Sequence, residues 1–73
     1  MATSVRAHIT GTVWKIEIAV GDVVTEGQTL VILESMKMEM PVESPVAGHV
    51  GAILTKEGAA VEEGAVLVEI DPA

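Results

Sequence analysis

The chain repeats itself at a fixed offset of 37 residues. Residues 9–34 align without a gap on residues 46–71, and nine of the 26 aligned pairs are identical, among them Gly21/Gly58, Gly27/Gly64 and Leu30/Leu67. Self-similarity at a constant period reflects architecture more directly than local propensity does. Two copies are too few for a solenoid, so we expect two similar halves packed face to face with approximate two-fold symmetry.

Each half has the sequence pattern of short strands joined by tight turns. In the first half an apolar strand from Gly11 leads to a turn at Gly21, and a short segment then leads to a second turn at Gly27 and a further apolar strand. Adding strands near Val5–Ile9 and Met38–Glu43 gives about eight strands of ordinary length. The sequence therefore predicts an all-β fold, a β-sandwich or flattened β-barrel in which the two halves bury each other's apolar faces.

The first long strand shows alternation with a period of two. Trp14, Ile16 and Ile18 fall on one face, and Lys15 and Glu17 fall on the other. This pattern predicts a strand with one side toward the core and one side toward water. Trp14, the only aromatic residue of the chain, is interpreted as packing in the core or at its rim.

Size and charge exclude several classes of function. We expect residues 1–73 to form a single domain, which is too small for a large buried active site. The net charge of −7 opposes binding to nucleic acid or to anionic membranes. The sequence holds no cysteine, which excludes thiolate chemistry, and no apolar run long enough to span a membrane. We expect a soluble cytoplasmic protein that is monomeric when isolated.

The segment that joins the halves, residues 35–45, has an unusual composition. Met36, Met38 and Met40 occur at alternate positions around a single cation, Lys37. A hairpin turn must fall here, yet none of the residues that usually accept a positive φ is present. The segment is either an ordinary hairpin with a solvated lysine or a site at which that lysine has a function.

This segment carries a resemblance to a known family. Glu34–Met40 resembles the attachment-site motif of biotinyl domains, usually Ala-Met-Lys-Met, with Ser35 in place of the alanine. The stretch Ser44–Val50 resembles the Pro-x-x-Gly-x-Val segment of the same family. The paired turns at 21–28 and 58–64 are similar as well, so the resemblance covers nearly the whole chain.

The resemblance implies a structure and a set of site residues. The family fold is a flattened barrel of two four-stranded antiparallel sheets, with the modified lysine at a hairpin tip and the termini together at the opposite end. The resemblance implies that biotin is attached covalently to Lys37 and that the flanking Met36 and Met38 are recognised by partner enzymes. It implies secondary contacts to the ligase and other partners from Glu34, Ser35 and Glu39.

The implied function is that of a carrier without catalytic activity. The chain resembles most the free-standing biotin/lipoyl attachment proteins, which carry a carboxyl group from a biotin carboxylase to a carboxyltransferase. Such carriers serve biotin-dependent acyl-CoA carboxylases, for example the acetyl-CoA carboxylase of fatty acid biosynthesis. Only about one exposed lysine amine in a thousand is unprotonated at neutral pH, so a biotin protein ligase must carry out the attachment.

Two other functions remain open. The chain could be a lipoyl carrier, or accept both groups, although the lipoyl lysine is more often found in an Asp-Lys-Ala setting. It could also be an unmodified structural adaptor in which Lys37 has no special role.

The remaining polar residues do not form a convincing site. His8 and His49 have no motif partners, and Glu62 and Glu63 are adjacent residues in a predicted turn. The stretch Gly48–Gly51 matches a GxxG nucleic-acid loop only superficially, because the chain is acidic and lacks the helices of that motif. We predict no catalytic residue and no metal site.

Overall fold

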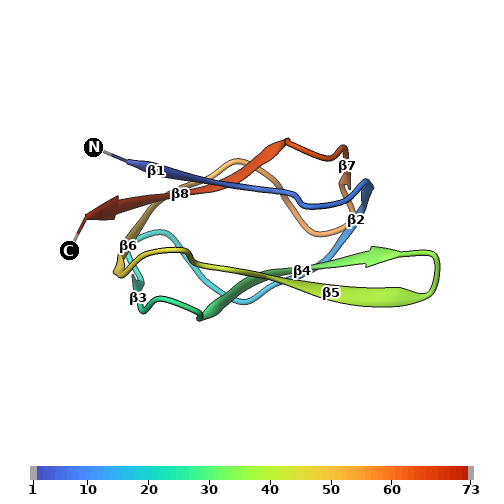
Figure 1. The fold of residues 1–73 in the computed structure, drawn as a ribbon. Helices are drawn as coiled ribbons and strands as arrows, with labels where there is room; N and C mark the ends of the chain where they lie inside the picture. The colour runs from blue at the N-terminus through green and yellow to red at the C-terminus, as the bar shows by residue number, and fades with distance from the viewer. Residues whose placement is uncertain (1, 73) are drawn as a thin grey trace.

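The computed structural model describes residues 2–72, which form eight β-strands and no helix (Figure 1). The strands are β1 (Thr3–Arg6), β2 (Gly11–Ile16), β3 (Val23–Val24), β4 (Thr29–Ser35), β5 (Met38–Glu43), β6 (Gly48–Ile53), β7 (Ala60–Val61) and β8 (Val66–Pro72). Within these described residues there is no helix of the length and apolar character needed to cross a membrane.

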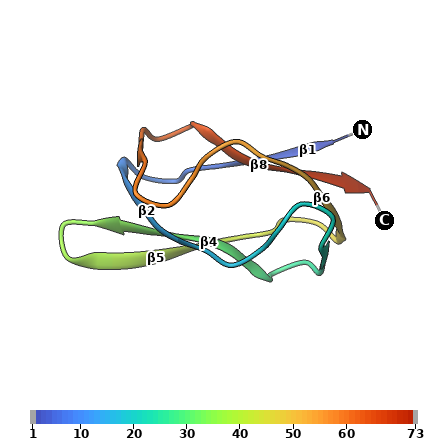
Figure 2. The same cartoon turned by 180° about the vertical axis from the view of Figure 1, so that it is seen from behind.

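The strands form two layers. One sheet has the order β1-β8-β6-β3 and the other has the order β5-β4-β2-β7, and all pairings are antiparallel. Figures 1 and 2 show the two layers from opposite sides, with the β4–β5 hairpin extending beyond them at one end. The molecule measures 35 × 17 × 17 Å. The predicted all-β fold of two four-stranded antiparallel sheets is confirmed, in the form of a sandwich because no strand pairing joins the two described sheets.

The sequence repeat is also a structural repeat. The bounds of β2, β3 and β4 recur in β6, β7 and β8 at the offset of 37 residues. Hydrogen bonds recur in the same way: the Gly21 N–H donates to the Val50 carbonyl, and the Gly58 N–H donates to the Val13 carbonyl, each over 2.8 Å. The two halves are therefore related by approximate two-fold symmetry.

The sheets do not correspond to the two halves. Each sheet combines strands of both halves, because β3 of the first half pairs with β6 of the second, and β7 of the second half pairs with β2 of the first. The expectation of two halves packed face to face thus needs correction: the halves exchange strands. The alignment of a repeat shows which segments are equivalent but not which of them pair.

Aliphatic side chains fill the space between the sheets. The core consists of small and β-branched residues together with four larger fully buried side chains, Leu30, Leu33, Leu67 and Ile70. Ser44 is the one polar residue in the described core, and its hydroxyl donates to the Val46 carbonyl over 2.6 Å. Fixed packing of this kind gives the hairpin a rigid base.

Trp14 does not pack in the core. The ladder between β2 and β4 pairs Val13 with Leu33 and then Lys15 with Ile32, so Trp14 is the extra residue of a β-bulge. The side chain of Val13 is buried, whereas that of Trp14 is 49% exposed. The predicted alternation was wrong here because one inserted residue reverses the order of faces along the strand.

Of two other strand predictions, one is confirmed by the structure and one needs correction. Ile16 and Ile18 do pack against or within the core, as the alternation predicted, although β2 ends at Ile16. The N-terminal strand covers Thr3–Arg6 rather than Val5–Ile9, because its ladder with β8 begins with the pair Thr3 and Ile70.

Two equivalent glycines allow the central strands to approach closely. A Cβ atom on Gly11 would lie 2.5 Å from the carbonyl oxygen of Glu34, and one on Gly48 would collide with the carbonyl oxygen of Asp71. Neither position accepts a larger side chain without movement of the backbone. Gly11 thereby holds β2 against β4 at the base of the β4–β5 hairpin.

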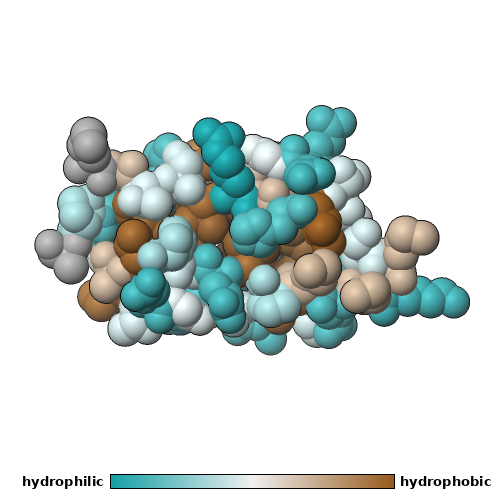
Figure 3. Space-filling model, in the orientation of Figure 1, coloured by the Kyte–Doolittle hydropathy of each residue, from teal (hydrophilic) through white to brown (hydrophobic). Residues whose placement is uncertain are grey.

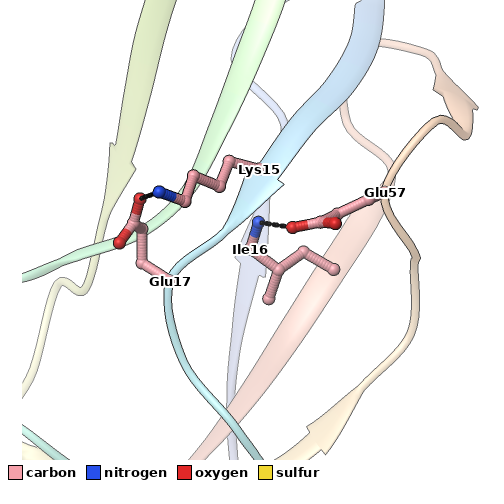
Figure 4. A network of polar contacts seen from close by, with 4 residues as sticks. All are labelled: Lys15, Ile16, Glu17 and Glu57. Atoms are coloured by element: carbon pink, nitrogen blue, oxygen red, sulfur yellow. Dashed lines mark hydrogen bonds and ion pairs between the residues drawn. The ribbon is translucent and has the colours of Figure 1, made fainter.

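The edge of β2 is closed by a side chain from the other half. Among the described residues, β7 pairs only with Gly11 and Thr12, so Ile16 at the end of β2 has no ladder partner on that side. Figure 4 shows the Glu57 carboxylate accepting a hydrogen bond from the Ile16 N–H over 3.0 Å. On the other side of β2, the Lys15 ammonium lies 3.5 Å from the Glu17 carboxylate.

Candidate functional site

The turn between β4 and β5 consists of two residues. Ser35 pairs with Met38 across the hairpin, which leaves Met36 and Lys37 as the loop. Both have a positive φ, 50° for Met36 and 68° for Lys37. Positive φ at both central positions is the backbone of a type I′ turn, which usually contains Asn or Gly. The sequence predicted a hairpin here without the usual residues, and the structure places two ordinary L-residues in the left-handed region.

The side chains of the turn point into solvent. Met36 is 93% exposed and Lys37 is also exposed. Within residues 2–72 the Lys37 ammonium makes no ion pair, in contrast to Lys15, which is paired with Glu17. The Lys37 amine is therefore accessible to a partner's active site from several directions.

Exposure increases steadily along the inner face of the hairpin. Leu33 is fully buried, its cross-strand partner Met40 is 37% exposed, and Met38 is 61% exposed. These three residues alternate toward the same face as the core. The hairpin therefore continues past the end of the opposing sheet, and Met38 lies on a face that the described residues leave largely uncovered. Figure 3 shows moderately hydrophobic residues in pale brown at this protruding end of the molecule.

The outer face of the hairpin is acidic. Glu34 and Glu39 are cross-strand partners, and both are exposed. Ser35, the neighbour of Glu34, is partly buried and lies on the same face as Met38. The structure thus brings all six sequence-predicted site residues into one turn and the two cross-strand pairs below it: Glu34, Ser35, Met36, Lys37, Met38 and Glu39.

His49 and Glu63 do not belong to this hairpin. The His49 imidazole is 3.7 Å from the Asp71 carboxylate, on β6 and β8 near the opposite end of the molecule. Glu63 takes part in a turn through its backbone N–H, which donates to the Thr10 hydroxyl over 3.2 Å. Among residues 2–72, no group of three or more His, Asp or Glu side chains is arranged to hold a metal ion.

Sequence reasoning missed the exposure of Trp14. The repeat alignment holds the signal that could have revealed it, since Trp14 is aligned with Gly51. Gly51 is the extra residue of an equivalent bulge between β6 and β8. Because the fold accepts glycine at this position of the second half, the side chain at the equivalent position of the first half is not needed to fill the core.

Fold and site together define a lysine-presenting carrier domain. The sandwich supplies a rigid body, the β4–β5 hairpin extends from one end, and Lys37 lies at its tip. The first residues of β1 and the last of β8 lie side by side at the opposite end (Figure 1).

The chain belongs to the biotin/lipoyl attachment family, described as "Biotin-requiring enzyme", whose sequence profile matches residues 1–70. It is 42% identical over 67 residues to the Biotin/lipoyl attachment protein of Bacillus subtilis, covering 92% of each chain. It is 40% identical over 70 residues to the Biotinylated protein TB7.3 homolog of Mycobacterium leprae, covering 96% of this chain and 99% of that one. Both relatives are named for a group that is attached to them. This agrees with the prediction that the present chain is a carrier without catalytic activity.

Similarity also extends to domains of much larger proteins. The structure superposes on part of the urea carboxylase of Kluyveromyces lactis with a TM-score of 0.92 and 39% identity, covering 97% of this chain but 6% of that one. The chain is 41% identical over 61 residues to the dihydrolipoyllysine-residue acetyltransferase component of the pyruvate dehydrogenase complex of Mycoplasma capricolum, covering 84% of this chain and 14% of that one. The family thus includes relatives named for biotin and relatives named for lipoyl-lysine.

Proposed function

We propose that this chain carries biotin as an amide on Nζ of Lys37 and conveys a carboxyl group between a biotin carboxylase and the carboxyltransferase of an acyl-CoA carboxylase. The observation that carries the proposal is the position of Lys37: an exposed amine at the tip of a two-residue turn, between Met36 and Met38. The M. leprae relative named as biotinylated and the description of the family as biotin-requiring support biotin as the group.

The attachment step requires a ligase. The Lys37 ammonium first loses a proton to the ligase, and the amine then attacks the carbonyl carbon of an activated acyl-adenylate. A carbon–nitrogen bond forms, the bond between that carbon and the phosphate oxygen breaks, and AMP leaves. The chain's own contribution is presentation, since the left-handed turn directs the Lys37 side chain away from both sheets.

The flanking residues support this role. Methionine side chains are flexible and polarisable, so Met36 and Met38 can adapt to pockets of more than one enzyme. Glu34, Ser35 and Glu39 lie directly below the turn, and in this proposal they make secondary contacts with the ligase and other partners. Once attached, biotin supplies the nitrogen that carries the carboxyl group.

The proposal is tested by incubating the chain with biotin, ATP and a biotin protein ligase and measuring its intact mass. We expect one biotin per chain in the wild type and in Lys56→Arg, an exposed lysine in the body of the second half, and none in Lys37→Arg. Labelling that persists in Lys37→Arg, or a folded wild type that remains unlabelled, would contradict the assignment. Transfer of radiolabelled bicarbonate onto the biotinylated chain by a biotin carboxylase, and from there to an acyl-CoA, tests the carboxyl-carrying step.

A lipoyl carrier is the second candidate. The relative from Mycoplasma capricolum favours it, whereas the Met-Lys-Met context favours biotin. A parallel reaction with lipoate and a lipoyl ligase distinguishes the two. A mass increase only with lipoate would replace the first proposal, and an increase in both reactions would identify an acceptor of both groups.

A further inference from the structure

An exposed aromatic residue lies on the same sheet as the lysine hairpin. Trp14 is the only tryptophan of the chain, and the bulge of β2 places half of its side chain in solvent. Tryptophan is enriched among the residues that contribute most to protein interfaces, because it buries a large rigid surface at small entropic cost. The equivalent bulge in the second half has Gly51, so the fold itself does not require the indole.

The surroundings of Trp14 can be read from the strand register. Residues directly opposite each other in antiparallel strands share a face, and Val13 and Leu33 mark the inner one. The outer face therefore carries the row Lys15, Ile32 and Pro41, across β2, β4 and β5. On the other side of Trp14 lies the row Thr12, Glu34 and Glu39. We call these residues, with Trp14, the tryptophan face.

The tryptophan face has an apolar centre and an acidic border. Ile32 is half-buried and Pro41 is exposed beside it. Glu34 and Glu39 lie toward the tip, and Glu43 lies at the far end of β5, where it pairs with Thr29. Lys15, the cation within the face, is paired with Glu17. Arg6 lines a groove beside Pro41 and Glu43, and its guanidinium donates to the Gly64 carbonyl. Charge complementarity therefore favours a partner whose surface has an apolar pocket bordered by Lys and Arg.

The distance to Lys37 indicates which partner this is. Trp14 is adjacent to the pair Val13 and Leu33, and Lys37 follows Leu33 by four residues, a span of at most about 13 Å because the last two of them form the turn. A carboxylase reaches the carried group through its long arm, whereas the ligase must take the Lys37 amine itself into its active site. The body of the ligase is therefore the surface that comes against residues this close to the turn.

We infer that the tryptophan face is the surface on which the lysine-modifying ligase seats this domain, with Trp14 inserted in a basic-bordered apolar pocket of the ligase. The inference rests on the proposed function, because it assumes that a ligase acts on Lys37. It adds a docking surface outside the Met-Lys-Met turn.

The first test follows Trp14 directly. A chain grown with 5-fluorotryptophan contains a single fluorinated residue, since Trp14 is the only tryptophan. We expect its ¹⁹F resonance to shift or broaden when unlabelled biotin protein ligase is added without ATP, and to recover as salt is raised. A resonance unchanged at ligase concentrations that saturate the reaction would overturn the inference.

The second test is kinetic. Trp14→Ala should raise the KM for the carrier by about tenfold with little change in kcat, because truncation of a central interface residue weakens docking but leaves the turn intact. Trp14→Phe should recover part of the loss. Leu54→Ala is the matched control, because Leu54 is 55% exposed and lies after β6 of the other sheet. Circular dichroism checks that each variant is folded.

The outcomes separate the two proposals. A labelled wild type together with an unchanged KM for Trp14→Ala, or an equal rise for Leu54→Ala, would overturn the docking surface alone. A folded wild type that no ligase labels would overturn the proposed function and the docking surface together.

Discussion

Glu34 and Glu39 face each other directly across the β4–β5 hairpin, two cross-strand positions below the tip, and both carboxylates are exposed. Like charges in directly opposed positions of an antiparallel pair are destabilising. We expect Glu39→Gln to raise the free energy of unfolding by about 0.3 kcal/mol at low ionic strength. Urea denaturation measures the change. Because salt screens the repulsion, the gain should shrink in concentrated NaCl.

Glu26→Gln is the control for this pair, because Glu26 lies in a turn and belongs to no strand pairing of the described residues. An equal gain in Glu26→Gln would show that overall net charge, and not the opposed pair, causes the effect.

The left-handed turn predicts a stabilising substitution. A non-glycine residue in the left-handed region costs about 1–2 kcal/mol, and asparagine tolerates this region better than methionine does. Met36→Asn should therefore raise the free energy of unfolding by about 0.5–1 kcal/mol. Met38→Asn, on the adjacent extended strand, should not. If thermal unfolding shows Met36→Asn to be less stable than the wild type, the turn does not have the backbone described.

The close approach at Gly48 predicts a large and specific loss. The Cβ atom of Gly48→Ala would collide with the backbone carbonyl of Asp71, whereas that of Gly51→Ala would meet only the movable carboxylate of the same residue. We expect Gly48→Ala to lower the free energy of unfolding by about 2–3 kcal/mol and Gly51→Ala by less than about 1 kcal/mol. Chemical denaturation of the two variants side by side measures the difference, and equal losses would contradict it.

The Glu57 side chain predicts a smaller loss. Its carboxylate accepts the Ile16 N–H at the unpaired edge of β2, so Glu57→Ala should cost about 1 kcal/mol. Amide hydrogen exchange should accelerate at Ile16 in this variant. Exchange at the Glu17 amide is the internal control, because it donates to the Leu30 carbonyl and does not depend on Glu57. Unchanged protection of Ile16 would show that the bond does not persist in solution.

Most of the fold could be predicted from one regularity. The 37-residue repeat indicated equivalent strands, and the glycines at its turns gave their spacing. The composition of residues 35–45 pointed to the lysine tip before any geometry was known. In each case the signal was local in sequence or was a comparison of the chain with itself.

The features that could not be predicted depend on partners distant in the chain. The exchange of strands depends on which strands form hydrogen-bonded ladders with each other. The hydrophobic pattern of the sequence is compatible both with one sheet per half and with sheets that combine strands of the two halves. The bulge at Trp14 is one unpaired residue that reverses the alternation of β2, and its one trace in the sequence is the alignment of Trp14 with Gly51. The positive φ of Met36 and Lys37 goes against local preference and is imposed by the registered strands on either side.

The exchange of strands between the halves also bears on how the domain folds. Neither half contains a complete sheet, because each sheet includes strands from both halves. A chain in which only one half has folded would leave both core faces in water, so we expect formation of the domain to be a single cooperative transition. The β4–β5 hairpin joins the two halves, and Leu33 and Val42 of its base pack in the shared core, so we expect its geometry to be fixed only in that transition. An enzyme that recognises the turn around Lys37 would consequently discriminate between folded and unfolded chains. Lys37 would then be modified only in chains that have completed folding.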